Sequence, residues 1–160
     1  MRFISLFAVA LIGTGCSTMQ SGKVPERFSG KSFEVSKDIT VLADDYAVVF
    51  QKGQITKGGG LSVWDTSCKL LMEKSQQESW NLSEGLYGIT GFQRYSTNCT
   101  LVYCVDIQEF SLQTTRGPVA DKLTCRQQYN IGDGSLGPEP ITAERLRITL
   151  GDYLRLKPAE

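Results

Sequence analysis

The sequence predicts a mainly β domain, built as an antiparallel sandwich or a barrel-like sheet with one C-terminal α-helix. Three observations support this fold class. From residue 32 onward, apolar and polar residues alternate along most of the chain, which is typical of strands with one buried face. Turn-forming Gly, Asn, Asp and Pro residues separate these runs. Helical spacing of apolar residues appears in one place, near the C-terminus.

The first two strands are expected around two pairs of apolar residues. Phe33 and Val35 alternate with polar neighbours, and Ile39 and Val41 do the same. Residues 37–38, a lysine and an aspartate, interrupt the pattern. We therefore predict two short strands with a break between them.

A hairpin is expected next. Residues 46–51 form an apolar run, and residues 54–56 form a second strand. Lys52 and Gly53 lie between them, which is typical of a two-residue hairpin turn. The three glycines at 58–60 precede no helix and no Lys-Ser/Thr pair, so we interpret them as a loop and not as a phosphate-binding motif.

The middle of the chain holds four more candidate elements. Residues 69–73 suit either a strand or a short helical turn. Residues 86–94 alternate and contain two glycines, which indicate a bend or a close backbone approach. Residues 100–112 are the longest strand candidate, and residues 123–129 form the strand that returns after a loop. Short strands separated by turns favour antiparallel pairing.

One helix is expected near the C-terminus. Leu146 and Leu150 lie one turn apart, Thr142 can cap the first turn, and Gly151 can end the helix. Its apolar stripe would lie against an edge or an end of the sheet. A last short strand is expected over residues 153–156.

Charge and composition limit the function. The chain has 160 residues, enough for one ordinary domain, and its 17 basic and 17 acidic side chains lack the positive surplus typical of nucleic-acid binders. It contains no histidine, the residue used most often as a general base and as a metal ligand. We therefore expect no nucleic-acid partner, no metal or other cofactor and no enzymatic activity.

The N-terminus has the pattern of a secretory signal peptide. Arg2 supplies a positive charge, and residues 3–12 form an apolar run that is shorter than the ~20 residues a membrane-spanning helix needs. Small residues at 13–15 lead into Cys16, and this junction resembles the lipobox of bacterial lipoproteins. The resemblance implies that residues 1–15 are removed and that Cys16 is lipidated and N-acylated. The alternative is an ordinary cleaved signal peptide in which Cys16 has no role.

The segment after Cys16 is expected to act as a tether. Cys16 is the odd member of five cysteines, and an unpaired thiol in an exported protein needs an explanation. Residues 17–28 are mostly polar, so we assign residues 16–28 to a lipidated cysteine with a flexible tether and residues 29–160 to a single mainly β domain. An aspartate directly after the lipidated cysteine would resemble an inner-membrane retention signal, but this chain has Ser17 at that position. The resemblance therefore implies the outer membrane, with the domain facing the periplasm.

Four cysteines remain in the domain: Cys68, Cys99, Cys104 and Cys125. In an oxidising compartment they predict two disulfides, with three possible pairings. If residues 99–104 formed one strand, its two cysteines would lie about 16 Å apart, so a bond between them needs a turn. Cys68 and Cys125 lie in strand-like sequence, and we favour a bond between them. A four-cysteine zinc site is the alternative, although the chain has no Cys-x-x-Cys pair.

Motifs for catalysis are weak. Residues 132–137 spell G-x-G-x-x-G, but prolines follow directly and the setting is antiparallel, so we interpret this segment as a loop. No serine lies in a G-x-S-x-G or S-x-x-K motif. Paired carboxylates can act without histidine. The candidates for such a pair are Asp44 with Asp45, Glu73, Glu78 and Glu84.

Aromatic side chains offer a second type of candidate site. A platform that binds sugars or peptides would use Trp64, Trp80, Tyr87, Phe92 and Tyr95. The chain has seven Phe, six Tyr and two Trp residues, and a core of this size needs most of them. Core packing is therefore the favoured interpretation.

The chain from residue 46 onward also resembles a loose group of uncharacterised proteobacterial lipoproteins. The shared features are a V-x-F-Q-x-G pattern at residues 48–53, a cysteine like Cys68 after an aromatic-containing strand, and an L-x-C element at residues 123–125. The resemblance implies no particular activity. It supports a bond between Cys68 and Cys125.

Two functions remain open. The first is a non-catalytic protein-interaction or envelope-maintenance module that binds another protein through a sheet face or edge. The second is a domain that binds or hydrolyses cell-wall glycans or peptides. A deep pocket with converging carboxylates, or exposed side chains of Trp64 and Trp80, would favour the second function.

The membrane anchor gives the first testable prediction. Intact-mass analysis of the protein extracted from membranes should show a chain that starts at Cys16 and carries acyl groups, because the N-terminal pattern resembles a lipobox. An unmodified Cys16, or cleavage at another position, would show that this interpretation is wrong.

Overall fold

The strands of the protein form one large curled sheet and a small second sheet. The computed structural model describes residues 20–42, 47–56, 61–72, 79–117, 119–131 and 139–158. The elements are β1 (Gln20–Gly22), β2 (Lys31–Val35), β3 (Ile39–Leu42), β4 (Ala47–Gln51), β5 (Gln54–Thr56), β6 (Ser67–Met72), β7 (Ser79–Leu82), β8 (Leu86–Thr97), β9 (Tyr103–Arg116), β10 (Ala120–Asn130), α1 (Ala143–Leu150) and β11 (Leu154–Pro158). The predicted mainly β fold with one C-terminal helix is confirmed.

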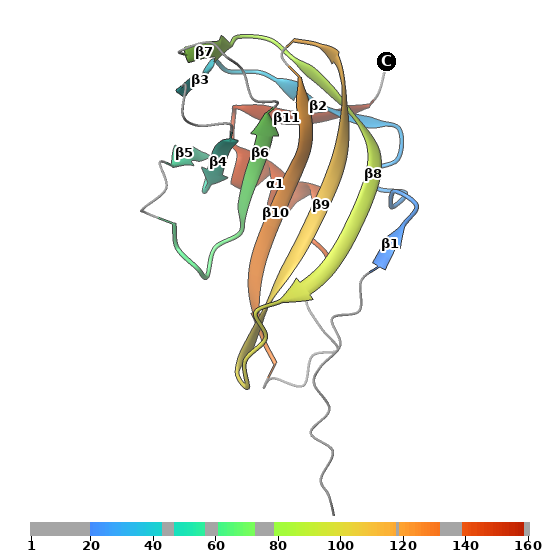
Figure 1. Cartoon of the computed structure of the whole chain (residues 1–160), viewed down its shortest axis with the longest axis vertical. Coiled ribbons are helices and arrows are strands. Elements are labelled where there is room, and N and C mark those ends of the chain that lie inside the picture. Colours follow the sequence, from blue (N-terminus) through green and yellow to red (C-terminus); the bar gives the residue numbers. More distant parts are fainter. Residues whose placement is uncertain are drawn as a thin grey trace, which may run out of the picture.

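The large sheet is antiparallel, and its two edge strands, β11 and β5, do not pair with each other. Its strand order is β11-β2-β8-β9-β10-β6-β4-β5, with β1 paired to β8, while β3 and β7 form the second sheet. Figure 1 shows that the large sheet curls around α1 as a half-barrel, with β8, β9 and β10 as its longest strands. The barrel-like alternative among the predicted architectures is therefore the one observed.

Strand β9 carries the centre of the core. Its buried residues alternate with half-buried ones, as expected for a strand that has one covered face. The ring of Phe110 lies on the covered face and contacts three other rings edge-on, at centroid distances of 5.0, 5.8 and 5.4 Å: those of Phe28, Phe33 and Phe92. Two leucines of α1 are buried in the same cluster, so the helix fills the inside of the curl.

The helix begins and ends at the predicted residues. The Thr142 hydroxyl accepts a hydrogen bond from the backbone N–H of Arg145 at 3.1 Å, and Gly151 ends the helix at a φ of 60°. Leu146 and Leu150 are buried, as their spacing predicts. No helix of the described chain is long and apolar enough to span a membrane.

The predicted hairpin between β4 and β5 packs against the end of this helix. Lys52 and Gly53 both have positive φ angles, 51° and 71°, which is typical of a two-residue turn between twisted strands. The N–H of Gly53 donates to the carbonyl of Thr149 at 3.1 Å. A Cβ atom on Gly151 would lie 2.6 Å from Cα of Gly53, so glycine is required where the two backbones meet.

Two strands differ from their predicted limits. The segment predicted as a strand over 100–112 is wrong at its start, because residues 99–102 form a turn and β9 begins at Tyr103. The choice left open for residues 69–73 is settled for the described part, since Ser67–Met72 is a strand. The predicted bend in β8 is confirmed by a register shift between Ile89 and Gly91.

The predicted tether is too long at its C-terminal end. Gln20–Gly22 pairs with β8, and Phe28 is fully buried beside Phe110. A backbone turn, in which the N–H of Phe28 donates to the carbonyl of Pro25 at 2.8 Å, directs this ring into the core. Burying the aromatic ring removes apolar surface from water, and this favourable free energy explains why a mostly polar segment packs against the domain. Residues 1–19, including Cys16, lie outside the described residues.

The four cysteines of the domain form two disulfides. Cys68 of β6 and Cys125 of β10 are directly opposite each other, with Cα atoms 4.0 Å apart, as favoured from the sequence. Cys99 and Cys104 form the second bond, which the turn at residues 99–102 makes possible. The zinc alternative is wrong, because all four sulfur atoms are in disulfides.

The two disulfides should differ in their contribution to stability. In the chain-entropy model, the bond between residues 57 positions apart contributes about 4 kcal/mol, and the bond between residues 5 positions apart contributes about 2 kcal/mol. Urea unfolding of Cys68→Ala/Cys125→Ala and Cys99→Ala/Cys104→Ala should therefore show the larger loss in the first variant. An equal loss, or a larger one in the second variant, would contradict this assignment.

Candidate functional site

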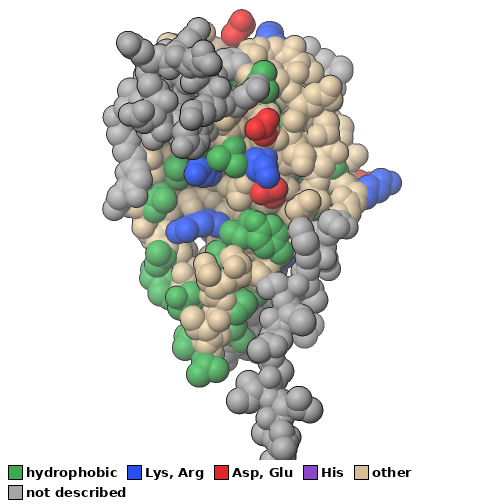
Figure 2. All heavy atoms as spheres, viewed as in Figure 1, with side chains coloured by type: hydrophobic (Ala, Val, Ile, Leu, Met, Phe, Trp, Pro, Cys, Tyr) green, Lys and Arg blue, Asp and Glu red, His purple; other side chains and the backbone are tan. Residues whose placement is uncertain are grey.

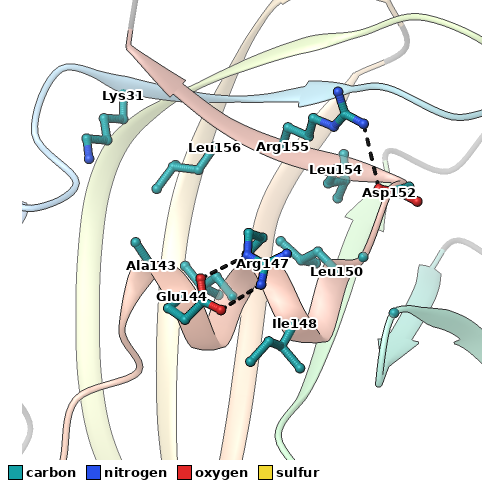
Figure 3. Close-up of a pocket in the computed structure, with 13 residues that line it drawn as sticks. Lys31, Ala143, Glu144, Arg147, Ile148, Leu150, Asp152, Leu154, Arg155 and Leu156 are labelled. Atoms are coloured by element: carbon teal, nitrogen blue, oxygen red, sulfur yellow. Dashed lines mark hydrogen bonds and ion pairs between the residues drawn. The ribbon is translucent and has the colours of Figure 1, made fainter.

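A groove with a volume of about 800 Å³ lies between α1 and β11. The helix forms one wall, and β11 with Lys31 of β2 forms the other; Figure 3 shows these side chains on either side of the space. Leu150 and Leu154 are buried and provide an apolar floor, while Ile148 is exposed at the rim. A space of this size suits a small ligand or a few side chains of a peptide.

Two ion pairs and one lysine set the charge of the groove. Arg147 contacts Glu144 at 2.7 and 2.8 Å, and this hydrogen bonding holds the pKa of the Glu144 carboxyl below its ordinary value. Arg155 lies 3.6 Å from the Asp152 carboxylate. Both pairs are largely exposed to solvent, so they contribute little to stability. Lys31 has no ion-pair partner among the described residues, and the groove therefore carries a small positive excess.

Strand β11 has one open edge beside this groove. It is an edge strand of the sheet, and its other edge pairs with β2. The N–H of Ser36 donates to the carbonyl of Tyr153, so by the alternation of an antiparallel ladder the backbone groups of Leu156 point away from β2. No described strand pairs with them. Pro158 lacks an N–H and limits the length of the open edge.

Of the carboxylates predicted as catalytic candidates, Glu84 alone lies in the described part of the chain. It is exposed and lies 4.0 Å from Arg116, away from the groove. The remaining candidates, and the two glycine-rich loops, lie outside the described residues: Asp44, Asp45, Glu73, Glu78, 58–60 and 132–137. The carboxylates that line the groove, Glu144 and Asp152, each face an arginine. Such ion pairs are poorly suited to donate a proton in catalysis.

The predicted aromatic platform is not assembled from its described members. Tyr87 is fully buried, which confirms core packing for this residue, and Phe92 packs against the core. Trp64 is instead 65% exposed, and its ring contacts that of Tyr103 edge-on at 6.5 Å. The backbone of Trp80 pairs with that of Val41 in the small sheet, and its side chain lies outside the described residues. Half-buried Tyr95 lies on β8.

A buried charge that the sequence analysis missed links three strands. Asp106 of β9 is 1% exposed, and its carboxylate accepts a hydrogen bond from Nε of Arg94 on β8 at 2.9 Å. It also accepts from the amides of Gln108 at 3.1 Å and Gln127 on β10 at 3.3 Å. Because three donors occupy this carboxylate, we interpret the cluster as a structural link. The sequence held one signal for this cluster: Asp106 lies on the same buried face of the strand as Phe110. A charge that is buried there needs hydrogen-bond partners.

Comparison with known proteins indicates no family and no function for these sites. No family model matches the chain, and neither a curated protein nor a solved structure matches it significantly. The groove, the open edge of β11 and the surface around Trp64 are therefore the features from which function must be inferred.

Buried Tyr87 gives a prediction about alkaline stability. Its hydroxyl has no hydrogen-bond partner among the described residues, and burial raises the pKa of Tyr87 to about 12. Between pH 10 and 12 the unfolded state releases this proton while the folded state keeps it, so the free energy of unfolding falls by up to about 3 kcal/mol. The substitution Tyr87→Phe should remove this part of the loss.

Urea unfolding of the wild type and Tyr87→Phe at pH 8 and pH 11 tests the point. At pH 8 the variant should be as stable as the wild type or about 1 kcal/mol more stable, because an unpartnered buried hydroxyl is removed. A clear loss of stability at pH 8 would show that the hydroxyl has a partner. An identical decline to pH 11 would show that burial does not raise the pKa of Tyr87.

Proposed function

We propose that this protein is a lipid-anchored, non-catalytic binding module that holds a short extended segment of another envelope protein in the groove between α1 and β11. The observation that carries the proposal is the combination of an apolar floor, charged rims and an open strand edge in one groove. An extended peptide can use all three features, because its backbone bonds to the edge while its side chains alternate between floor and solvent.

The chemistry of the groove supports a peptide with an apolar side chain and a negative charge. Leu154 and Leu156 come from the strand, and Leu146 and Leu150 from the facing helix, so one inserted apolar side chain would be enclosed from both walls. Lys31 would attract a carboxylate at the same site. Because the open edge offers the backbone groups of Leu156 in a short stretch, we expect few backbone hydrogen bonds and moderate affinity.

The cell-envelope location in this proposal rests on two further observations. The N-terminal segment resembles a lipobox, which supports attachment at Cys16 to the periplasmic side of the outer membrane. Two disulfides support an oxidising compartment. Neither observation depends on the groove, so location and ligand are tested separately.

The glycan-binding alternative has one observation in its favour, the exposed side chain of Trp64. Trp64 does not line the groove. The carboxylates in the groove face arginines rather than converging on an open position. We therefore rank the protein-binding function first.

Peptide selection tests the proposal. The purified full-length protein should select, from a displayed random library, peptides with an apolar residue next to an acidic one. Leu156→Lys should weaken binding of a selected peptide about tenfold or more, because one buried apolar contact is lost and a charge is introduced. Fluorescence anisotropy with the labelled peptide measures this change.

Val119→Lys is the matched control, because Val119 is another exposed apolar residue and lies outside the groove. It should bind the peptide as the wild type does. If no peptide is selected, or if both variants bind equally, the groove is not the binding site. Binding of cell-wall glycan fragments that Trp64→Ala abolishes would favour the alternative function.

A further inference from the structure

The turn that joins β8 to β9 is unusual because its central residues are apolar and exposed. Leu101 is 98% exposed and Val102 is 63% exposed. The N–H of Thr100 donates to the carbonyl of Tyr103 at 2.8 Å, and the Thr100 hydroxyl accepts from the N–H of Tyr103 at 3.1 Å, which closes the turn around these two residues. Central turn positions normally hold Gly, Pro, Asn, Asp or Ser. We call residues 98–104 the distal tip.

The distal tip is held in one conformation. The disulfide between Cys99 and Cys104 spans the turn, and the carbonyl of Val102 accepts a hydrogen bond from the N–H of Ile131 at 2.8 Å. Leu101 and Val102 are therefore fixed in solvent, although their own transfer into an apolar environment would be favourable. Natural proteins depart from such turn preferences mainly at functional or strained sites. The two exposed apolar residues therefore point to a binding surface.

Further apolar side chains surround the distal tip. Ile131 is exposed next to Val102, and Trp64 extends the surface through its contact with Tyr103. Val63 beside Trp64 is also exposed. Figure 2 shows hydrophobic side chains over the lower end of the long strands, whereas charged side chains gather higher, over the middle of this face. The sequence has no charged residue over 95–105 or 127–131.

The composition and shape of this surface fit a lipid bilayer better than a protein. A stable protein interface uses about 20–30 residues on each side, and the distal tip projects only a few. The interfacial region of a bilayer accepts single projecting aliphatic side chains, and Trp and Tyr are enriched at its polar boundary. Here two aliphatic residues project furthest, and the pair formed by Trp64 and Tyr103 lies behind them.

The register of β1 directs Gln20 toward the same end of the sheet. Gln20 pairs with Arg94 and Gly22 with Phe92, so Gln20 is the residue of β1 that lies nearest the distal tip. From Arg94 to residue 98 the strand advances about 13 Å. The four residues from Cys16 to Gln20 can reach at most about 14 Å. This reach is long enough for an acyl group on Cys16 to share a membrane with the distal tip.

We propose that the distal tip inserts Leu101 and Val102 into the interfacial region of the bilayer that holds the lipid anchor. This inference rests on the lipid anchorage in the proposed function and adds a second contact with the same membrane. Two contacts at one end of the sheet restrict the orientation of the domain. They direct the groove between α1 and β11 away from the membrane.

Tryptophan quenching in vesicles tests the insertion. The full protein, purified from membranes, is reconstituted into phosphatidylcholine vesicles, with or without bromine atoms on the upper part of the acyl chains. Leu101→Trp adds a reporter at the distal tip. Val119→Trp is the matched control, because Val119 is exposed in the loop between β9 and β10, at the other end of these strands. The wild type, with two tryptophans, gives the background.

The added emission of Leu101→Trp should shift to shorter wavelength and fall in brominated vesicles relative to plain ones, while that of Val119→Trp should not. In addition, Leu101→Ser/Val102→Ser should reduce the quenching seen in the wild type, with an unchanged near-ultraviolet circular dichroism spectrum. Exposed positions make both substitutions compatible with folding.

Two outcomes would overturn the insertion. They are equal quenching of the two added tryptophans and no quenching of either. The mass of the same sample separates this inference from the anchor. A lipidated Cys16 with an unquenched Leu101→Trp rejects the insertion alone. An unmodified Cys16 with a quenched Leu101→Trp rejects the anchor and supports the insertion.

Discussion

The inward face of β9 is the constraint on which the rest of the structure depends. Phe110 on this face is the centre of the aromatic core, and Asp106, nearer the distal tip, links β9 to both neighbouring strands. Cys104, one step further along the same face, closes the tip through its disulfide. A shift of β9 by one residue would turn all three side chains to the opposite face. One register therefore determines the core, the buried polar link and the shape of the tip.

This arrangement gives the two ends of the sheet different properties. β2 and β11 pair near the start of β8, where Ser32 lies opposite Gly88, and the groove lies at this end. The distal tip follows the end of β8, ten residues further along, which corresponds to about 30 Å. A membrane contact at one end and a peptide at the other are thus compatible in space. The polar link at Asp106 lies between them and keeps the long strands together where the helix does not cover them.

Local chemistry made part of this structure predictable. The cap at Thr142, the end of the helix at Gly151 and the turn at residues 52–53 each depend on neighbours in the sequence, and all were predicted. The pairing of β1 with β8, the groove and the partners of Asp106 depend on which strands lie side by side, and alternation alone does not determine that. Residues 100–102 were wrongly predicted as strand because Leu101 and Val102 continue an apolar pattern. Hydrogen bonds between Thr100 and Tyr103 close a turn there instead, and the disulfide between Cys99 and Cys104 spans it.

The central claim is that one end of the sheet faces the membrane while the groove remains free. Hydrogen–deuterium exchange of the full protein on vesicles, compared with the protein in detergent, tests it most directly. The account predicts slower exchange on vesicles in residues 98–104 and unchanged exchange in α1 and β11. Slower exchange in α1 and β11, with residues 98–104 unchanged, would contradict it, because the groove and not the tip would then lie against the membrane.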